Sequence, residues 1–206
     1  MAGGWLQRTG LALADATQDA WFFPRLAVTY YNRGVLYLAG GDFDKAAADF
    51  SETIRLNPRL FMAYQNRGVV YQERGEHGLA LADSQRALSL CRDLPSLHKY
   101  LPQLHVNRAI SYKMLGELER AIAEIELALR VNPRFAAAYC ERGVIHQAEG
   151  RPEQAMADFD IAIRLEPRNA LFLRCRGCGY FYAGDFARAA ADLDRSLSRE
   201  FEPMRQ

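Results

Sequence analysis

The 206-residue sequence has no long hydrophobic run and almost no net charge. No segment approaches the roughly 20 consecutive apolar residues that a transmembrane helix requires, so we expect no membrane partner. Lysine and arginine number 26 against 25 aspartates and glutamates, which leaves a net charge of +1 without a block of like charge. A nucleic-acid partner is therefore not expected. Residues Met1 to Trp5 lack the basic start of a signal peptide, and we expect a cytoplasmic protein.

Cysteine is scarce, with four residues at Cys91, Cys140, Cys175 and Cys178. These are too few for a disulfide framework, so reduced thiols are expected. The Cys175-x-x-Cys178 pair suggests redox or metal chemistry, but a zinc site needs four ligands and a thioredoxin-type motif needs a strand before its helix. A thiol-based metal or redox protein, with Cys140 as a third thiol, is the least favoured alternative. We expect no metal and no cofactor.

Catalytic motifs are also missing from the sequence. It contains no Ser–His–acid order, no glycine-rich phosphate loop and no cluster of paired carboxylates. The four histidines fall at unrelated positions of the repeat that is described next. We therefore expect a protein that is not an enzyme.

An internal repeat is the main positive feature of the chain. Two glycines seven residues apart, followed after five more residues by an alanine, recur at Gly34, Gly68, Gly143 and Gly177. The units begin at Ala27, Phe61, Pro102, Ala136 and Ala170, and successive starts are 34 residues apart except for one step of 41. A fixed internal period indicates an array of repeats and not a domain with a single core.

Each unit carries the pattern of two helices. Small or bulky residues at unit positions 4, 8 and 11 form the stripe of an amphipathic helix, as in Tyr30, Gly34 and Tyr37. A glycine at unit position 15 ends that helix, and a second stripe runs through unit positions 20, 24, 27 and 28. A proline such as Pro58 then closes the unit, because proline lacks the N–H group and disfavours helix in the preceding residue.

The repeated spacing Y-x₂-R-G-x₂-Y…G-D-F…A-x₃-F-x₂-A…N-P resembles the tetratricopeptide repeat. The resemblance extends from Ala27 to about Phe201, with departures at Ala109, Leu118 and Ser84. It implies an all-α fold, a right-handed α-solenoid of five helix-turn-helix units over residues 27–206, whose core is a continuous seam between neighbours. Counting back in the same phase, we expect residues 1–26 to form an N-terminal capping helix, a half-repeat.

Two irregularities interrupt or end the array. The insertion at about residues 92–101 has apolar members that would lengthen helices or form a lid beside the groove, and a neutral loop is an equally supported alternative. At the other end, Arg199 and Ser196 occupy positions that hold apolar residues or Thr53 in the earlier units. These two changes suggest that the fifth unit ends the array.

Every unit also combines an arginine at unit position 7 with an acid at unit position 23. In an antiparallel hairpin these positions lie at the same height. A partly buried arginine without a carboxylate is costly, so we favour a structural ion pair within each hairpin over a row of arginines that grips an acidic ligand. The pairs are Arg33 with Asp49, Arg67 with Asp83, Arg108 with Glu124, Arg142 with Asp158 and Arg176 with Asp192.

The resemblance implies that the first helix of each unit lines a concave groove through unit positions 2, 5, 6, 9, 12 and 13. Position 6 is asparagine in three consecutive units, at Asn32, Asn66 and Asn107. An amide donates and accepts hydrogen bonds, so this ladder would bind the backbone of an extended peptide; the alternative is a solvated face that tolerates asparagine. The other candidate peptide-binding residues are Tyr31, Gln65, Gln72, Lys113, Glu141, Gln147, Leu171, Arg174, Phe181 and Tyr182.

We predict a non-catalytic protein–protein interaction scaffold that binds an extended or helical segment of a partner protein in the groove. Leu171, Phe181 and Tyr182 form a candidate pocket, with Arg174 for a carboxylate. The alternative is a structural protein that self-associates into a homo-oligomer through its aromatic ends. Those ends are Trp5, Trp21 to Phe23, and Phe201 to Met204. Arginine greatly outnumbers lysine, which suggests a bacterial source.

Overall fold

A computed structural model of the chain describes residues 25–201, and the side chains of residues 25–199. Every regular element in this part is a helix, and the residues form two compact units, one through Asp93 and one from Leu94. None of the helices in these residues is long and apolar enough to cross a membrane. The predicted capping helix lies outside the described residues, apart from Arg25 and Leu26, which belong to the helix over residues 25–39.

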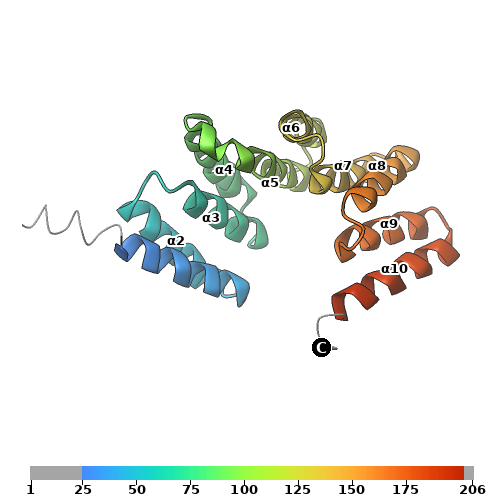
Figure 1. Cartoon of the computed structure of the whole chain (residues 1–206), viewed down its shortest axis with the longest axis horizontal. Coiled ribbons are helices and arrows are strands. Elements are labelled where there is room, and N and C mark those ends of the chain that lie inside the picture. The colour runs from blue at the N-terminus through green and yellow to red at the C-terminus, as the bar shows by residue number, and fades with distance from the viewer. Residues whose placement is uncertain (1–24, 202–206) are drawn as a thin grey trace, which may run out of the picture. The chain divides into compact units, whose positions relative to one another are not determined.

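The first unit contains two helical hairpins (Figure 1). The helix over residues 25–39 pairs with α2 (Phe43–Leu56), and α3 (Phe61–Glu73) pairs with α4 (His77–Arg92). The hairpins join where α2 packs on α3. Phe50 of α2 and Val70 of α3 are completely buried there, so the core lies between successive hairpins as a repeat array requires.

The second unit contains three hairpins, preceded by the short 3₁₀ helix η1 (Pro95–Tyr100). Within it α6 packs on α7 and α8 on α9, while among the first helices of the hairpins α5 contacts α7 and α7 contacts α9. The predicted all-α class of paired helices is confirmed, and the right-handed winding of the whole array stays a prediction. The hairpins are α5 (Leu101–Met114) with α6 (Leu118–Val131), α7 (Ala136–Ala148) with α8 (Pro152–Leu165), and α9 (Ala170–Tyr182) with α10 (Phe186–Phe201).

The repeated glycines serve two structural purposes. The glycine that ends the first helix of each hairpin, such as Gly150, has φ between 72° and 78°, a left-handed conformation that other residues rarely adopt. Gly143 instead allows close helix contact, because a Cβ atom there would lie 2.6 Å from Cε1 of Phe159 and 3.0 Å from the carbonyl oxygen of Ala155. One glycine therefore turns the chain, and the other lets two helices approach.

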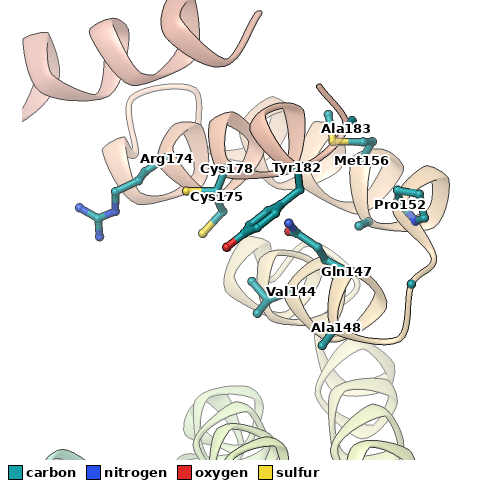
Figure 2. Close-up of a pocket in the computed structure, with 13 residues that line it drawn as sticks. Val144, Gln147, Ala148, Pro152, Met156, Arg174, Cys175, Cys178, Tyr182 and Ala183 are labelled. Atoms are coloured by element: carbon teal, nitrogen blue, oxygen red, sulfur yellow. The ribbon is translucent and has the colours of Figure 1, made fainter. Parts of the chain in front are cut away.

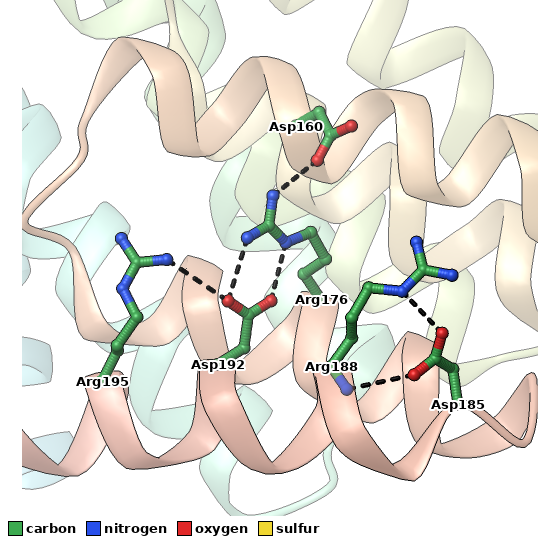
Figure 3. Close-up of polar contacts among 6 residues, drawn as sticks. All are labelled: Asp160, Arg176, Asp185, Arg188, Asp192 and Arg195. Carbon is green, nitrogen blue, oxygen red and sulfur yellow. Dashed lines mark hydrogen bonds and ion pairs between the residues drawn. The ribbon is translucent and has the colours of Figure 1, made fainter.

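The five arginine–acid pairs hold the two helices of each hairpin together, which confirms their structural interpretation. In Figure 3, Arg176 of α9 donates from Nε and Nη2 to the two carboxylate oxygens of Asp192 on α10, at 2.7 and 2.9 Å. Three other hairpins have the same bidentate geometry. In the α5–α6 hairpin the Nδ1 atom of His105 lies 2.7 Å from Glu124, and Arg108 reaches Glu124 at 3.4 Å.

These arginines also connect successive hairpins, which the sequence pattern did not predict. Arg176 donates from Nη1 to Asp160 of α8 at 2.7 Å, and Arg67 donates from Nη1 to the Ser51 hydroxyl of α2 at 2.9 Å. Asp160 and Ser51 both occupy unit position 25 of the preceding hairpin. One guanidinium thus satisfies a carboxylate in its own hairpin and a polar group in the hairpin before it.

The insertion lengthens α4 to 16 residues and then forms η1. No residue of η1 is buried, and η1 contacts α5. Ser196 is 3% exposed, and its hydroxyl donates to the Ala170 carbonyl oxygen at 2.9 Å within the last hairpin. Thr53 makes the corresponding contact with Ala27 at 3.5 Å in the first described hairpin, and the end of the array after the fifth unit stays a prediction.

Candidate functional site

A pocket of about 770 Å³ lies in the second unit between α7, α8 and α9. The first helices α7 and α9 form two of its walls, and the start of α8 forms the third (Figure 2). Its lining residues are Val144, Gln147, Ala148, Gly150, Pro152, Ala155, Met156, Arg174, Cys175, Cys178, Gly179, Tyr182 and Ala183.

The pocket uses most of the unit positions that the family resemblance assigns to the groove. Helix α7 contributes unit positions 9, 12 and 13, and α9 contributes unit positions 5, 6, 9 and 13. Three of the predicted peptide-binding residues, Gln147, Arg174 and Tyr182, therefore meet around one pocket. Figure 2 shows the Tyr182 ring beside Gln147, with Arg174 extending away from them.

Two other members of the predicted pocket lie elsewhere, so that grouping is corrected. Neither Leu171 nor Phe181 lines the pocket. Leu171 and Tyr182 stand eleven residues apart on one helix, which corresponds to about 16 Å along its axis. The Phe181 ring instead packs edge-on against Tyr182 and against Phe186 of α10, with centroids 5.9 and 5.7 Å apart. Tyr182 thus belongs both to the pocket wall and to an exposed aromatic cluster of Phe181, Tyr182 and Phe186.

The α8 wall of the pocket was not predicted from the sequence. Met156 and Pro152 come from α8, a second helix, whereas the prediction placed only first helices along the groove. The Met156 sulfur can approach α9 closely because unit position 10 is Gly179 here, and a Cβ atom on Gly179 would lie 3.0 Å from that sulfur. The same unit position holds the buried Val70 and Ile145 elsewhere. A glycine at a core position was the signal available in the sequence.

The predicted residues Lys113 and Glu141 bind each other. Lys113 of α5 donates to Glu141 of α7 at 2.7 Å, and their side chains are 19% and 21% exposed. This pair joins the first helices of two successive hairpins. Because each side chain neutralises the charge of the other, Lys113 and Glu141 do not offer two separate charges to a bound peptide in this structure.

The three asparagines of the predicted ladder have three different environments. Asn32 is exposed on the first described helix, and Asn66 is half-buried and donates to the Tyr31 hydroxyl at 3.1 Å. Asn107 is 7% exposed and accepts from Gln103 at 2.8 Å. The expectation of three accessible amides is therefore wrong for Asn107, because a glutamine one turn earlier on the same helix occupies its oxygen. Gln65 and Gln72 are half-buried in the first unit.

Three thiols lie close to the pocket, two in its lining and one in the buried core beside it. Cys175 and Cys178 line the pocket, whereas Cys140 of α7 is 2% exposed in the core cluster against which Cys175 packs. The hydrogen bond between Cys140 and Cys175 raises the pKa of Cys140, as does burial, and the same bond lowers the pKa of Cys175. No group of three or more His, Cys, Asp or Glu side chains is placed to hold a metal ion within residues 25–199.

Comparison with known proteins identifies the repeat. Models of the tetratricopeptide repeat match residues 27–60 and 106–170. The sequence has no significant match among curated proteins. The chain belongs to the tetratricopeptide-repeat family, as its helical hairpins and repeated motif also indicate.

Solved structures share this fold. TTC0263, a thermophilic TPR protein of Thermus thermophilus, is 22% identical with a TM-score of 0.76, covering 87% of this chain and 94% of its own. PilF of Pseudomonas aeruginosa is 17% identical with a TM-score of 0.67, over 86% of this chain and 78% of its own. YrrB, described as a TPR protein with an unusual peptide-binding site, is 20% identical with a TM-score of 0.54, over 86% and 88%.

Proposed function

We propose that the chain is a non-catalytic scaffold that binds a segment of a partner protein in the pocket between α7, α8 and α9. The observation that carries the proposal is the convergence of groove positions from two successive first helices on one concave, mainly apolar pocket. Tetratricopeptide repeats are generally interaction modules, and the solved structure of YrrB is described by its peptide-binding site. Both support a peptide as the ligand of this chain.

The lining predicts the character of the bound segment. Val144, Met156 and the ring of Tyr182 offer apolar contact, and Gln147 offers a hydrogen-bond donor and acceptor at the rim. A cavity of about 770 Å³ accommodates one or two large side chains of an extended or helical segment. We therefore expect an apolar anchor residue in the pocket, with Arg174 favouring an acidic residue beside that anchor.

Filling the pocket tests the proposal directly. A binding peptide is first selected from a displayed random library on the purified chain, and its Kd is measured by fluorescence polarisation. Ala148 is exposed at the pocket wall, so Ala148→Trp fills space without disturbing the core. We expect it to weaken binding at least roughly tenfold, the effect of losing one buried anchor.

Ala39 provides a matched control for this test. It occupies the same unit position 13 as Ala148 and is also exposed, but it belongs to the first unit. Ala39→Trp should leave the Kd unchanged. Equal affinities of the wild type and Ala148→Trp, or equal losses in both variants, would show that the peptide binds elsewhere.

A second candidate function is self-association, and the exposed aromatic cluster favours it. Phe181, Tyr182 and Phe186 are 56%, 78% and 63% exposed, although large aromatic side chains usually bury most of their surface. The predicted contacts through Trp5 and through Trp21 to Phe23 lie outside the described residues, as do Met204 and the side chain of Phe201. The cluster gives the self-association hypothesis a defined surface within the described part of the chain.

A further inference from the structure

The neighbouring thiols of α7 and α9 have chemistry that peptide binding does not use. Cys140 extends from α7 into the core cluster of Phe159 and Phe172, and Cys175 of α9 packs against that cluster while also lining the pocket. The two helices contact each other, and Cys175 packs against the cluster to which Cys140 belongs. One sulfur of the pair is thus accessible from the pocket, and the other lies behind it.

We propose that Cys175 is a site of oxidation by hydroperoxides and that Cys140 is its resolving thiol, so that the two residues form a disulfide between α7 and α9. The bond would require the two sulfur atoms to approach to about 2.05 Å. The proposal concerns residues of the second unit alone. It is independent of which ligand occupies the pocket.

The reaction balances with hydrogen peroxide as the oxidant. The Cys175 thiolate attacks one peroxide oxygen, an S–O bond forms, the O–O bond breaks, and the departing hydroxide takes up the proton released by Cys175 to become water. The Cys140 sulfur then attacks the sulfenic sulfur and the S–O bond breaks. The second oxygen leaves as water with the Cys140 proton. Two thiols lose two electrons in total, and one peroxide gains them.

Access favours Cys175 as the thiol that reacts first, because Cys175 lines the pocket whereas Cys140 is 2% exposed. The hydrogen bond from Cys140 lowers the pKa of Cys175, and Arg174 and Lys113 act in the same direction against burial and Glu141. A thiolate is the nucleophile, so this increases the reactive fraction of Cys175 at neutral pH. Burial raises the pKa of Cys91 to about 11. Cys91 lies completely buried on α4, which makes it an internal control for slow oxidation.

Cys178 could form a disulfide with Cys175 in place of Cys140, so the test must distinguish the two disulfides. It is exposed and lies one helical turn after Cys175 on the same helix. Trypsin places the three cysteines of this region in separate peptides, so each possible disulfide links a different pair of peptides. It cleaves after Arg134, Arg142, Arg174, Arg176 and Arg188. Cys140 then lies in the peptide 135–142, Cys175 in the dipeptide 175–176 and Cys178 in the peptide 177–188.

The experiment treats the full chain with hydrogen peroxide at neutral pH, alkylates the remaining thiols under denaturing conditions and maps the unreduced tryptic peptides by mass spectrometry. We expect peptide 135–142 linked to 175–176 in the wild type and in the Cys178→Ser and Cys91→Ser variants. Free Cys175 should disappear at least roughly tenfold faster than free Cys91, as its thiolate character and access predict. In Cys140→Ala this link is absent, and Cys175 proceeds to the sulfinic acid or links to Cys178.

Three results would overturn the proposal. In the first, the main wild-type product links peptide 177–188 to either of the other peptides. In the second, Cys175 is oxidised no faster than Cys91. In the third, Cys140 can still be alkylated after Cys175 has been consumed. Circular dichroism of each variant before oxidation confirms that the helices are intact. Peptide binding is a separate measurement, so failure of either proposal leaves the other unaffected.

Discussion

At the residue scale, the arginine of each hairpin is a stabilising residue whose removal leaves a buried carboxylate. Arg67 and Asp83 have side chains that are 19% and 8% exposed, and two hydrogen bonds of 2.7 and 2.8 Å join them. Breaking a mostly buried pair by removing one partner costs about 3 kcal/mol. We therefore expect Arg67→Ala to lower the free energy of unfolding by that amount, measured by urea titration followed by circular dichroism.

Arg33 is the matched control for this prediction. Its side chain is 55% exposed although it makes the same bidentate contact with Asp49. Water can replace an exposed guanidinium, so Arg33→Ala should destabilise the chain less than Arg67→Ala does. If the two variants melt alike, or if Arg67→Ala melts normally and only loses peptide binding, the structural role assigned to the arginine is wrong.

The glycines at unit position 8 differ in what they face, and alanine substitution should reveal it. A Cβ atom on Gly143 would lie 2.6 Å from the Phe159 ring, whereas on Gly68 the nearest atoms, including the Ser84 hydroxyl, are 3.6 to 3.7 Å away. We expect Gly143→Ala to destabilise the chain by about 1–3 kcal/mol through overpacking. Gly68→Ala should be neutral or slightly stabilising, because alanine is the better helix former.

Thermal melts of the two glycine variants, monitored by circular dichroism, provide the measurement. The chain already contains one natural comparison, since Ala109 occupies this unit position in the α5–α6 hairpin and is completely buried there. Equal melting temperatures of Gly143→Ala and the wild type would mean that the Phe159 ring moves aside without cost, and that the close approach is not required.

At the element scale, the sequence predicted what repeats in every unit and failed where a single unit differs. The helix pairs and the arginine–acid contacts follow from the period alone, because spacing within one hairpin determines which residues share a height. The pocket depends on side chains of one hairpin against the next. Period and polarity did not reveal that Gln103 would donate to the Asn107 side-chain oxygen, that Lys113 would pair with Glu141, or that Gly179 would let the Met156 sulfur approach α9.

The insertion illustrates the same limit and leads to a prediction about η1. Its residues have no buried side chain, and its main chain makes short-range turns such as Leu97 N–H to the Leu94 carbonyl at 2.9 Å. Segments with exposed backbone and little packing are cut first by proteases. Within residues 25–201 we expect trypsin to cleave first after Arg92 or Lys99, as timed digestion and mass spectrometry would show.

A peptide selected on the purified chain then decides whether the insertion participates in binding. No residue of the insertion lines the pocket, so cleavage after Arg92 or Lys99 should proceed at the same rate with and without saturating peptide. Protection by the peptide would show that η1 acts as a lid. First cleavage inside α5 or α6 would show that the packing of the second unit is looser than the burial of Leu104 and Ile125 implies.

At the scale of the whole molecule, the proposed peptide pocket and the proposed self-association surface are neighbours that share Tyr182, and one variant can separate the two functions. Phe186 belongs to the aromatic cluster but does not line the pocket. We expect Phe186→Glu to bind the selected peptide with unchanged Kd while lowering the weight-average mass in light scattering at high protein concentration, because a charge opposes burial of the cluster. Leu79→Glu, at an apolar residue that is 50% exposed in the first unit, is the control. An unchanged weight-average mass for Phe186→Glu would rule out self-association through the cluster. A higher Kd for the peptide would place the peptide on the cluster instead of in the pocket.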